Sequence, residues 1–267
     1  MTATGTLLGV WAHPDDEAYL SAALMATARR AGERVVVVTA TRGELGTDDP
    51  AGWSPDRLAR SRERELDESL RVVGVEEHRW LDYADGSLAA ADAQPAIATL
   101  GRIIAEIEPD TIVTFGPDGM TGHDDHRTIS SWVTQAWRLS GGAARLWYAT
   151  LTPEFHATWG VLNERVGLWF DGAQPPVTLR RDLAAHIVCS GPSLDVKHRA
   201  LRAHVSQTRP LEELVGARTY RAWWSSESFV AAGSAERALR PSSGAAARDR
   251  PGSSYAGRRE PRPPASG

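Results

Sequence analysis

The chain has 267 residues, 42% of them hydrophobic and 24% charged, which is the composition of an ordinary globular protein. Its formal net charge of −4 argues against a general nucleic-acid binder, since such proteins usually carry a basic stripe. The single cysteine, the lack of an apolar run of roughly 18 to 20 residues and an N-terminus without a basic start predict a cytoplasmic protein that does not span a membrane.

Apolar runs and helical patterns alternate along the first half of the chain. Short runs rich in β-branched or aromatic residues predict buried strands at 6–12, 34–41, 77–82, 111–116 and 144–150. Helical patterns lie between them, at about 18–31, 54–74, 94–108 and 123–142. The second of these helices has the clearest ends, with Ser54 as N-cap, Pro55 in the first turn and Gly74 as the stop signal.

This order of elements predicts an α/β fold with a mostly parallel sheet and helices on both faces. In such sheets, ligands bind beyond the carboxyl ends of the strands. Polar clusters follow the predicted strands at that edge, namely HPDDE at 13–17, TRGELG at 41–46, DYADG at 82–86 and GPDGMTGHDDH at 116–126. No G-x-G-x-x-G or Walker-type loop occurs, so the sequence does not support a nucleotide site.

The composition changes near residue 233. Residues 233–267 include seven arginines, three acidic residues and many Pro, Gly and Ser. Such a segment cannot bury enough apolar surface to offset the entropy of ordering it. We therefore expect a single domain at residues 1–232 and a disordered basic tail at 233–267.

Two of the polar clusters contain donors that suit a metal ion. His13 and Asp16 are three residues apart across a strand-to-helix turn stiffened by Pro14, so both side chains can aim at one point. His123 and His126 are three apart at another helix start, and residues at that spacing share a helix face. With a single cysteine in the chain, histidine nitrogen and carboxylate oxygen are the ligands available to zinc. The clusters predict a zinc site with an open position for water.

Each cluster also has an ordinary explanation when it is taken alone. The run of Asp15, Asp16 and Glu17 could complement the positive end of a helix dipole, and histidines at a helix start are often surface residues. The joint position of the clusters at the carboxyl ends of strands favours the metal site. Asp15 must point away from its neighbour Asp16, so it is free to face a substrate.

Six segments together resemble the PIG-L or LmbE-like family of N-acetylglucosaminyl de-N-acetylases. AHPDDE at 12–17 resembles the first signature of that family, and TGHDDHR at 121–127 resembles its second. Less specific matches are TRGELG, RERELDESLRVVGV, LDYADGSL and KHRALRAHVSQ, so the resemblance extends over roughly residues 7–207. The second signature usually has proline where this chain has Asp124, and an added acid there is expected to strengthen cation binding or to shift the pKa of neighbouring groups.

The resemblance implies a Rossmann-like fold and a zinc-dependent hydrolase that removes an acetyl or similar acyl group from an N-acetylglucosaminyl-type amide. It implies His13, Asp16 and His126 as the ligands of one Zn²⁺ per chain. The implied partner is a small N-acetylated, sugar-like molecule, with no role for nucleic acid or membrane. The oligomeric state stays open.

The resemblance also implies catalytic roles by motif position. Asp15 would be the general base that takes a proton from zinc-activated water. His123 would stabilise the oxyanion. Asp125 would orient a histidine.

Substrate contacts are expected at three further motif positions. Glu44, Arg62 and Asp85 lie in segments that resemble the substrate-facing parts of the family. Arg62 could instead form a solvated ion pair, because it lies in the charge-rich run RSRERELDE. Trp53 is a candidate for stacking on a sugar ring. Glu17 is left with a general role at the helix start or in support of the site.

Two other functions fit the same motifs. A metal-dependent phosphoesterase also uses an acid-rich rim, although the number of histidines and the lack of a phosphate-binding glycine loop count against it. A non-enzymatic binding module on the same fold would have no need of Asp15, the one acid that the metal does not require.

Overall fold

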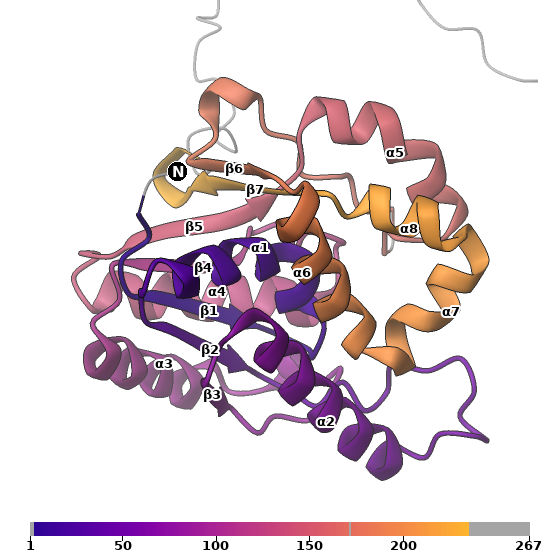
Figure 1. Cartoon of the computed structure of the whole chain (residues 1–267). Coiled ribbons are helices and arrows are strands. Elements are labelled where there is room, and N and C mark those ends of the chain that lie inside the picture. The colour runs from indigo at the N-terminus through magenta and orange to yellow at the C-terminus, as the bar shows by residue number, and fades with distance from the viewer. Residues whose placement is uncertain (1–2, 171, 235–267) are drawn as a thin grey trace, which may run out of the picture.

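A seven-stranded sheet forms the centre of the protein (Figure 1). The computed structural model describes residues 3–170 and 172–234, so the predicted tail lies outside the described residues from 235 onward. The order across the sheet is β3-β2-β1-β4-β5-β7-β6. The strands are β1 (Leu7–Trp11), β2 (Val35–Thr39), β3 (Glu77–Trp80), β4 (Thr111–Phe115), β5 (Arg145–Thr150), β6 (Ala185–Val188) and β7 (Ser226–Ala231).

The first five strands are parallel, which confirms the mostly parallel sheet expected from the sequence. Every residue of β1, β2 and β4 is buried, and this explains why their sequences are continuous apolar runs rather than alternating ones. At one edge, β7 runs antiparallel to both β5 and β6. Strands β6 and β7 come from a part of the chain in which the sequence had predicted no strands.

Helices cover both faces of the sheet, as expected (Figure 1). Helix α6 contacts both α1 and α2 in one layer, and α3 contacts α4 in the other. Helices α5, α7 and α8 lie beyond the carboxyl ends of the central strands (Figure 1). The helices are α1 (Asp16–Arg30), α2 (Pro55–Val73), α3 (Ala93–Ile107), α4 (Asp124–Leu139), α5 (Pro153–Arg165), α6 (Gly191–Ala203), α7 (Val205–Val215) and α8 (Ala217–Trp223), with short 3-10 helices η1 (Leu88–Ala90) and η2 (Arg180–Asp182).

Local sequence sets the helix ends. The Ser54 hydroxyl accepts a hydrogen bond from the Arg57 N–H at 3.4 Å and so caps α2. Gly74 ends the same helix with a φ of 79°, a left-handed conformation that favours glycine. Helix α3 ends at Ile107, before Pro109, because the residue preceding a proline is biased away from helical geometry.

A buried ion pair joins α1 to the antiparallel edge of the sheet. Lys197 and Glu227 have no exposed side-chain surface, and their charged atoms lie 2.6 Å apart. Lys197 Nζ also donates to the carbonyl oxygen of Tyr19 at 2.6 Å, and Glu227 accepts from the N–H groups of Ala23 and Leu24 at 2.8 and 2.9 Å. In an uninterrupted helix the Ala23 N–H would pair with the Tyr19 carbonyl. The ion pair therefore engages backbone groups inside α1.

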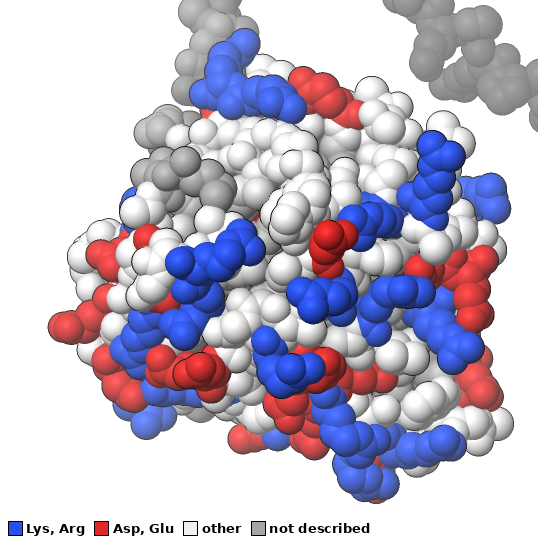
Figure 2. All heavy atoms as spheres, in the orientation of Figure 1, with Lys and Arg blue, Asp and Glu red and all other residues white. Residues whose placement is uncertain are grey.

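The surface is polar and mixed in charge. Figure 2 shows basic and acidic side chains interspersed over the face that it draws, in keeping with the mild net charge. Arg34 and Glu77, for example, form a surface ion pair with 2.6 Å between their charged atoms. Within residues 3–170 and 172–234, none of the helices combines the length and the apolar character that a membrane span requires.

Candidate metal and catalytic site

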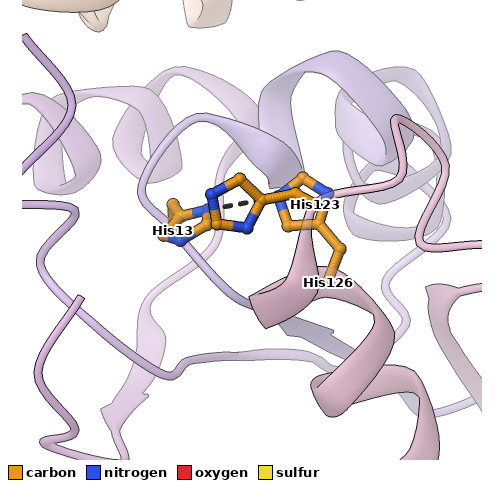
Figure 3. Close-up of side chains that lie close together, drawn as sticks. All are labelled: His13, His123 and His126. Carbon is orange, nitrogen blue, oxygen red and sulfur yellow. Dashed lines mark hydrogen bonds between the residues drawn. The ribbon is translucent and has the colours of Figure 1, made fainter. Parts of the chain in front are cut away.

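The turns that follow β1 and β4 meet at one edge of the sheet. The chain winds from β1 through β2 to β3 on one side, whereas β4 and β5 lie on the other, so β1 and β4 flank the point where the strand order reverses. In open parallel sheets, such a switch point leaves a crevice for a ligand. His13 follows β1, His123 and His126 follow β4 at the start of α4, and the three rings gather there (Figure 3).

His13, Asp16 and His126 present donor atoms to one another. His13 Nδ1 lies 3.1 Å from His126 Nε2 and 3.7 Å from Asp16 Oδ2. Asp16 Oδ1 lies 3.4 Å from His126 Nε2. All three residues are buried. Two imidazole nitrogens and a carboxylate arranged in this way could hold one metal ion and leave a coordination position open.

The second nitrogen of each of these rings faces an acceptor. His126 Nδ1 lies 3.0 Å from the carbonyl oxygen of Gly119. His13 Nε2 lies 3.0 Å from Asp85 Oδ1 and 3.4 Å from Asp125 Oδ2. A proton on each of these nitrogens leaves the lone pairs of His126 Nε2 and His13 Nδ1 turned toward Asp16. Metal-binding histidines are usually oriented by such partners, so this donor set fits a metal ion.

Besides the three histidines His13, His123 and His126, a group made of His13, Asp85 and Asp125 also offers possible metal donors, on the far side of the His13 ring. The oxygens of Asp125 are already engaged, since they accept hydrogen bonds from the N–H groups of Gly86 at 2.8 Å and Leu88 at 3.2 Å. The two carboxylates are better suited to orient His13 than to bind an ion. The resemblance implied that Asp125 orients a histidine, and His13 is the ring it contacts; the contact of Asp85 with His13 was not foreseen.

Burial and close charges control ionisation in the cluster. Burial raises the pKa of Asp16 to about 7 despite the nearby charge of His13. Burial opposes a charge on His13 as well, but hydrogen bonds to Asp125 and Asp85 raise the pKa of His13 to about 10. Burial and the charge of His13 hold the pKa of His126 well below its ordinary value, so its ring is neutral. A divalent cation would favour ionised Asp16 and would displace the His13 proton on binding.

Asp15 stands beside the cluster in an unusual backbone conformation. It precedes α1 with a φ of 114°, a value that residues with a side chain seldom adopt. Such strain persists only where surrounding contacts hold it, and it concentrates at functional sites. The Asp15 side chain keeps 17% of its surface exposed and borders the same cavity as the candidate metal ligands.

Arg62 holds two of the motif loops together. Its Nη1 donates to the Gly43 carbonyl oxygen at 2.9 Å, while Nη2 donates to the Pro14 carbonyl oxygen and lies 3.4 Å from Asp15 Oδ1. A Cβ at Gly43, whose φ is 63°, would lie 2.3 Å from Arg62 Nη1, so this loop requires glycine. Arg62 is only 3% exposed, and its interpretation as a solvated ion pair is therefore wrong.

Glu17 supports Asp15, which agrees with the supporting role expected for it, although its partners were not foreseen. Its Oε2 accepts from the Asp15 N–H at 2.9 Å. Its Oε1 accepts from the Ser69 hydroxyl at 2.7 Å and lies 2.7 Å from His204 Nε2. Glu17 and His204 have no exposed surface. The contacts join α1, α2 and the α6–α7 junction beneath Asp15.

Replacing Glu17 by glutamine should weaken this support. Three donors converge on the carboxylate, and an amide offers one acceptor oxygen, so at least one donor would face the NH₂ group. We expect the free energy of unfolding to fall by about 1–3 kcal/mol, with a lower kcat and unchanged metal content. Denaturant unfolding, kinetics and metal analysis on one preparation would measure this. Glu68→Gln on the exposed side of α2 is the control, and equal behaviour of the two variants would contradict the role.

His123 combines a capping role with a free donor. Its Nδ1 accepts from the Asp125 N–H at 3.1 Å in the first turn of α4. Burial and the charge of His13 lower the pKa of His123, which favours the neutral ring. A neutral ring that accepts at Nδ1 carries its proton on Nε2. Because the ring borders the cavity, His123 offers an N–H donor beside the cluster.

Two other predicted residues lie away from the cavity wall. Glu44 is not among the residues that line the cavity, and its Oε1 accepts from the Asp85 N–H at 2.9 Å, so it supports the segment that carries Asp85. The side chain of Asp124 is 72% exposed and lies 3.4 Å from Arg127. Its charge faces solvent, yet it acts to raise the pKa of His123 against the larger opposing effect of burial, so the expected influence on a neighbouring pKa is present. A contribution to cation binding stays a prediction.

Most of the candidate residues line one cavity of about 880 Å³, whereas Glu44 and Asp125 do not form part of its wall. Its lining includes the three candidate ligands together with Asp15, Arg62, Asp85, His123 and Trp53. The Arg57 guanidinium covers one face of the Trp53 ring at 4.7 Å. A volume of this size is within the range of pockets that enclose small organic ligands.

The chain is similar to known proteins in both sequence and fold. The profile of the family described as PIG-L, GlcNAc-PI de-N-acetylase, matches residues 8–137. A Saccharomonospora viridis protein named 1D-myo-inositol 2-acetamido-2-deoxy-alpha-D-glucopyranoside deacetylase is 31% identical over 228 residues, which cover 75% of this chain and 84% of that protein. This chain belongs to the PIG-L family.

Other PIG-L relatives show how far the likeness extends. A Kineococcus radiotolerans protein of the same name is 36% identical over 164 residues, which cover 51% of this chain and 45% of that protein. The chain thus spans about half the length of some curated relatives that it matches. The structure of N,N'-diacetylchitobiose deacetylase from Pyrococcus horikoshii gives a TM-score of 0.59 at 21% identity, covers 89% of this chain and 87% of that chain, and shows a shared fold.

The PIG-L match includes every candidate metal ligand but not every supporting residue. The matched region ends within α4, so it contains the turns after β1 and β4. His204, Lys197 and Glu227 lie beyond it. These three residues contact α1 or Glu17, so part of the support for α1 and Asp15 comes from outside the region that the family profile matches.

Proposed function

We propose that this chain is a metal-dependent deacylase of N-acetylglucosaminyl-type amides. The amide C–N bond breaks. The OH group of a water molecule adds to the acyl carbon, and the other proton of that water goes to the amine nitrogen. The observation that carries the proposal is the convergence of donor atoms from His13, Asp16 and His126 beside Asp15 in one cavity. Relatives named as deacetylases of an acetamido sugar on inositol support this substrate class.

We take zinc as the metal. Two imidazole nitrogens and one carboxylate are a common ligand set of catalytic zinc sites, which keep a position open. His13 would bind through Nδ1, His126 through Nε2 and Asp16 through its carboxylate. When bound, the ion would supply a Lewis acid that polarises the acyl carbonyl and makes water a better nucleophile near neutral pH.

The side chains around the metal ligands would move the protons. The Asp15 carboxylate would take a proton from the attacking water and pass it to the nitrogen of the departing amine. His123 Nε2–H would donate to the acyl oxygen as negative charge develops on it. Arg62 and Glu17 would keep the Asp15 carboxylate in place, since one lies 3.4 Å from its oxygen and the other accepts its N–H.

Arg62, Asp85 and Trp53 would contact the sugar. Guanidinium and carboxylate groups offer fixed donors and acceptors to hydroxyl groups, and these three residues border the cavity. Trp53 would stack on the sugar with the ring face that Arg57 leaves uncovered. Glu44 would contribute through Asp85, whose N–H it accepts.

Release of acetate and amine tests the proposal. The zinc-loaded protein should produce the two in equal amounts from an N-acetylglucosaminyl conjugate. EDTA should abolish this turnover and added Zn²⁺ should restore it, because the catalytic water depends on the ion. Turnover of a phosphate ester with Mg²⁺ and none of any N-acetylated sugar would indicate a phosphoesterase instead. Sugar binding without any turnover would indicate a binding module.

A further inference from the structure

One part of the cavity, the apolar end, is lined by large hydrophobic side chains. These side chains keep only 6–9% of their surface exposed, so they are largely buried and present a small apolar surface to the cavity. A second space of only about 20 Å³ borders the same side chains, together with residues 149–152 of β5 and its following turn and residues 226–228 of β7, which include polar side chains such as Thr150 and Glu227. The lining side chains are Leu20, Met120, Leu151, Phe155 and Trp224.

This apolar end begins next to the candidate metal ligands. Leu20 lies one helical turn beyond Asp16 in α1, and side chains at that spacing are about 5–6 Å apart on one helix face. Met120 directly follows Gly119, whose carbonyl oxygen lies 3.0 Å from His126 Nδ1. A carbonyl group held at the cluster would therefore have hydrocarbon side chains beside it.

Another part of the cavity rim is polar. Asp48 and Asp49 border it from the loop after β2, and Gln207 borders it from α7. The Gln207 Nε2 donates to the Gly46 carbonyl oxygen at 3.0 Å, which joins these two segments. Exposed carboxylates and an amide suit the hydroxyl groups of a sugar, whereas a hydrocarbon chain would gain nothing from them.

The geometry of an amide assigns these two regions to the two halves of the substrate. A secondary amide is almost always trans, so its acyl chain and its nitrogen substituent extend in opposite directions from the carbonyl group. With the carbonyl at the His13, Asp16 and His126 cluster and the sugar toward the polar rim, the acyl chain points into the apolar end. We infer that the enzyme prefers N-acyl groups longer than acetyl, such as butanoyl or hexanoyl, an inference that rests on the proposed deacylase function.

An acyl-length series on one glucosaminyl scaffold tests this preference. N-acetyl, N-butanoyl, N-hexanoyl and N-octanoyl substrates release the same amine, so a single amine assay compares them directly. Burial of each added methylene should raise kcat/KM by about fourfold until the apolar end is full. The hexanoyl substrate should therefore exceed the acetyl substrate by roughly tenfold or more.

Filling the apolar end provides a test from the side of the protein. Leu151→Trp should lower the ratio of kcat/KM for hexanoyl over acetyl by roughly tenfold, because the added ring occupies the space of the chain. Leu139→Trp is the matched control, since Leu139 is 78% exposed in α4, and it should leave the ratio unchanged. Thermal unfolding of both variants would show whether they are folded.

The possible outcomes separate this inference from the proposed function. Ready cleavage of the acetyl substrate with a steady fall in kcat/KM toward octanoyl would overturn the acyl preference and leave the deacylase function standing. An unchanged ratio in folded Leu151→Trp would also overturn it. If Leu151→Trp does not fold, the series on the unaltered protein decides the question. If no member of the series releases amine, the result would instead contradict the proposed function.

Discussion

Asp15→Asn is expected to lower kcat by about 10²–10⁴-fold while the protein keeps its metal. Asparagine has nearly the same shape as aspartate but no basic carboxylate, so it cannot take a proton from water. Asp16→Ala and His126→Ala should lose both activity and metal, because each removes one of three converging donors. Metal analysis of dialysed, folded protein, together with kinetics on an N-acetylglucosaminyl amide, would separate these two kinds of loss.

Asp124→Asn is the matched control for the same region of the protein. The Asp124 side chain is 72% exposed, so the substitution should change neither metal content nor kcat. Loss of metal from Asp15→Asn with retention in Asp16→Ala would reverse the assigned roles. Nearly full activity of metal-loaded Asp15→Asn would exclude Asp15 as the general base.

Glu227→Ala is expected to lower the free energy of unfolding by about 3–5 kcal/mol. The substitution leaves the Lys197 ammonium without a carboxylate in a place with no exposed surface. It also removes the acceptor of the Ala23 and Leu24 N–H groups inside α1. For a chain of this size the loss corresponds to a fall in Tm on the order of 10 °C, which calorimetry would measure.

Glu106→Ala offers a comparison at the surface. Glu106 also pairs with a basic residue, Arg79, but its side chain is 61% exposed, and exposed pairs contribute little to stability. Its Tm should therefore stay close to that of the unaltered protein. Replacing Lys197 and Glu227 together by methionine and glutamine should recover part of the loss, because no unpaired charge is left buried. Equal Tm values for Glu227→Ala and Glu106→Ala would show that the buried pair does not hold α1.

Most of the framework around the site was predictable from local sequence. Continuous β-branched runs such as VVVVT and TIVTF are typical of strands buried on both faces, and β2 and β4 are such strands. The Ser54 cap and the Gly74 stop mark the ends of α2 because they act within a few residues of themselves. The antiparallel strands β6 and β7 were not predicted, since their pairing depends on a chain reversal across distant helices.

The sequence by itself determined which chemical groups reach the carboxyl edge of the sheet. His13, Asp16 and His126 follow two strands, and parallel strands bring their carboxyl ends to one side. Only the tertiary structure decided which atoms meet there. The contact between Glu17 and His204 spans 187 positions of the chain, and the contact between Asp85 and His13 joins two separate turns. Such contacts are set by how whole helices and loops pack on the sheet, and no periodicity or spacing within one segment encodes that packing.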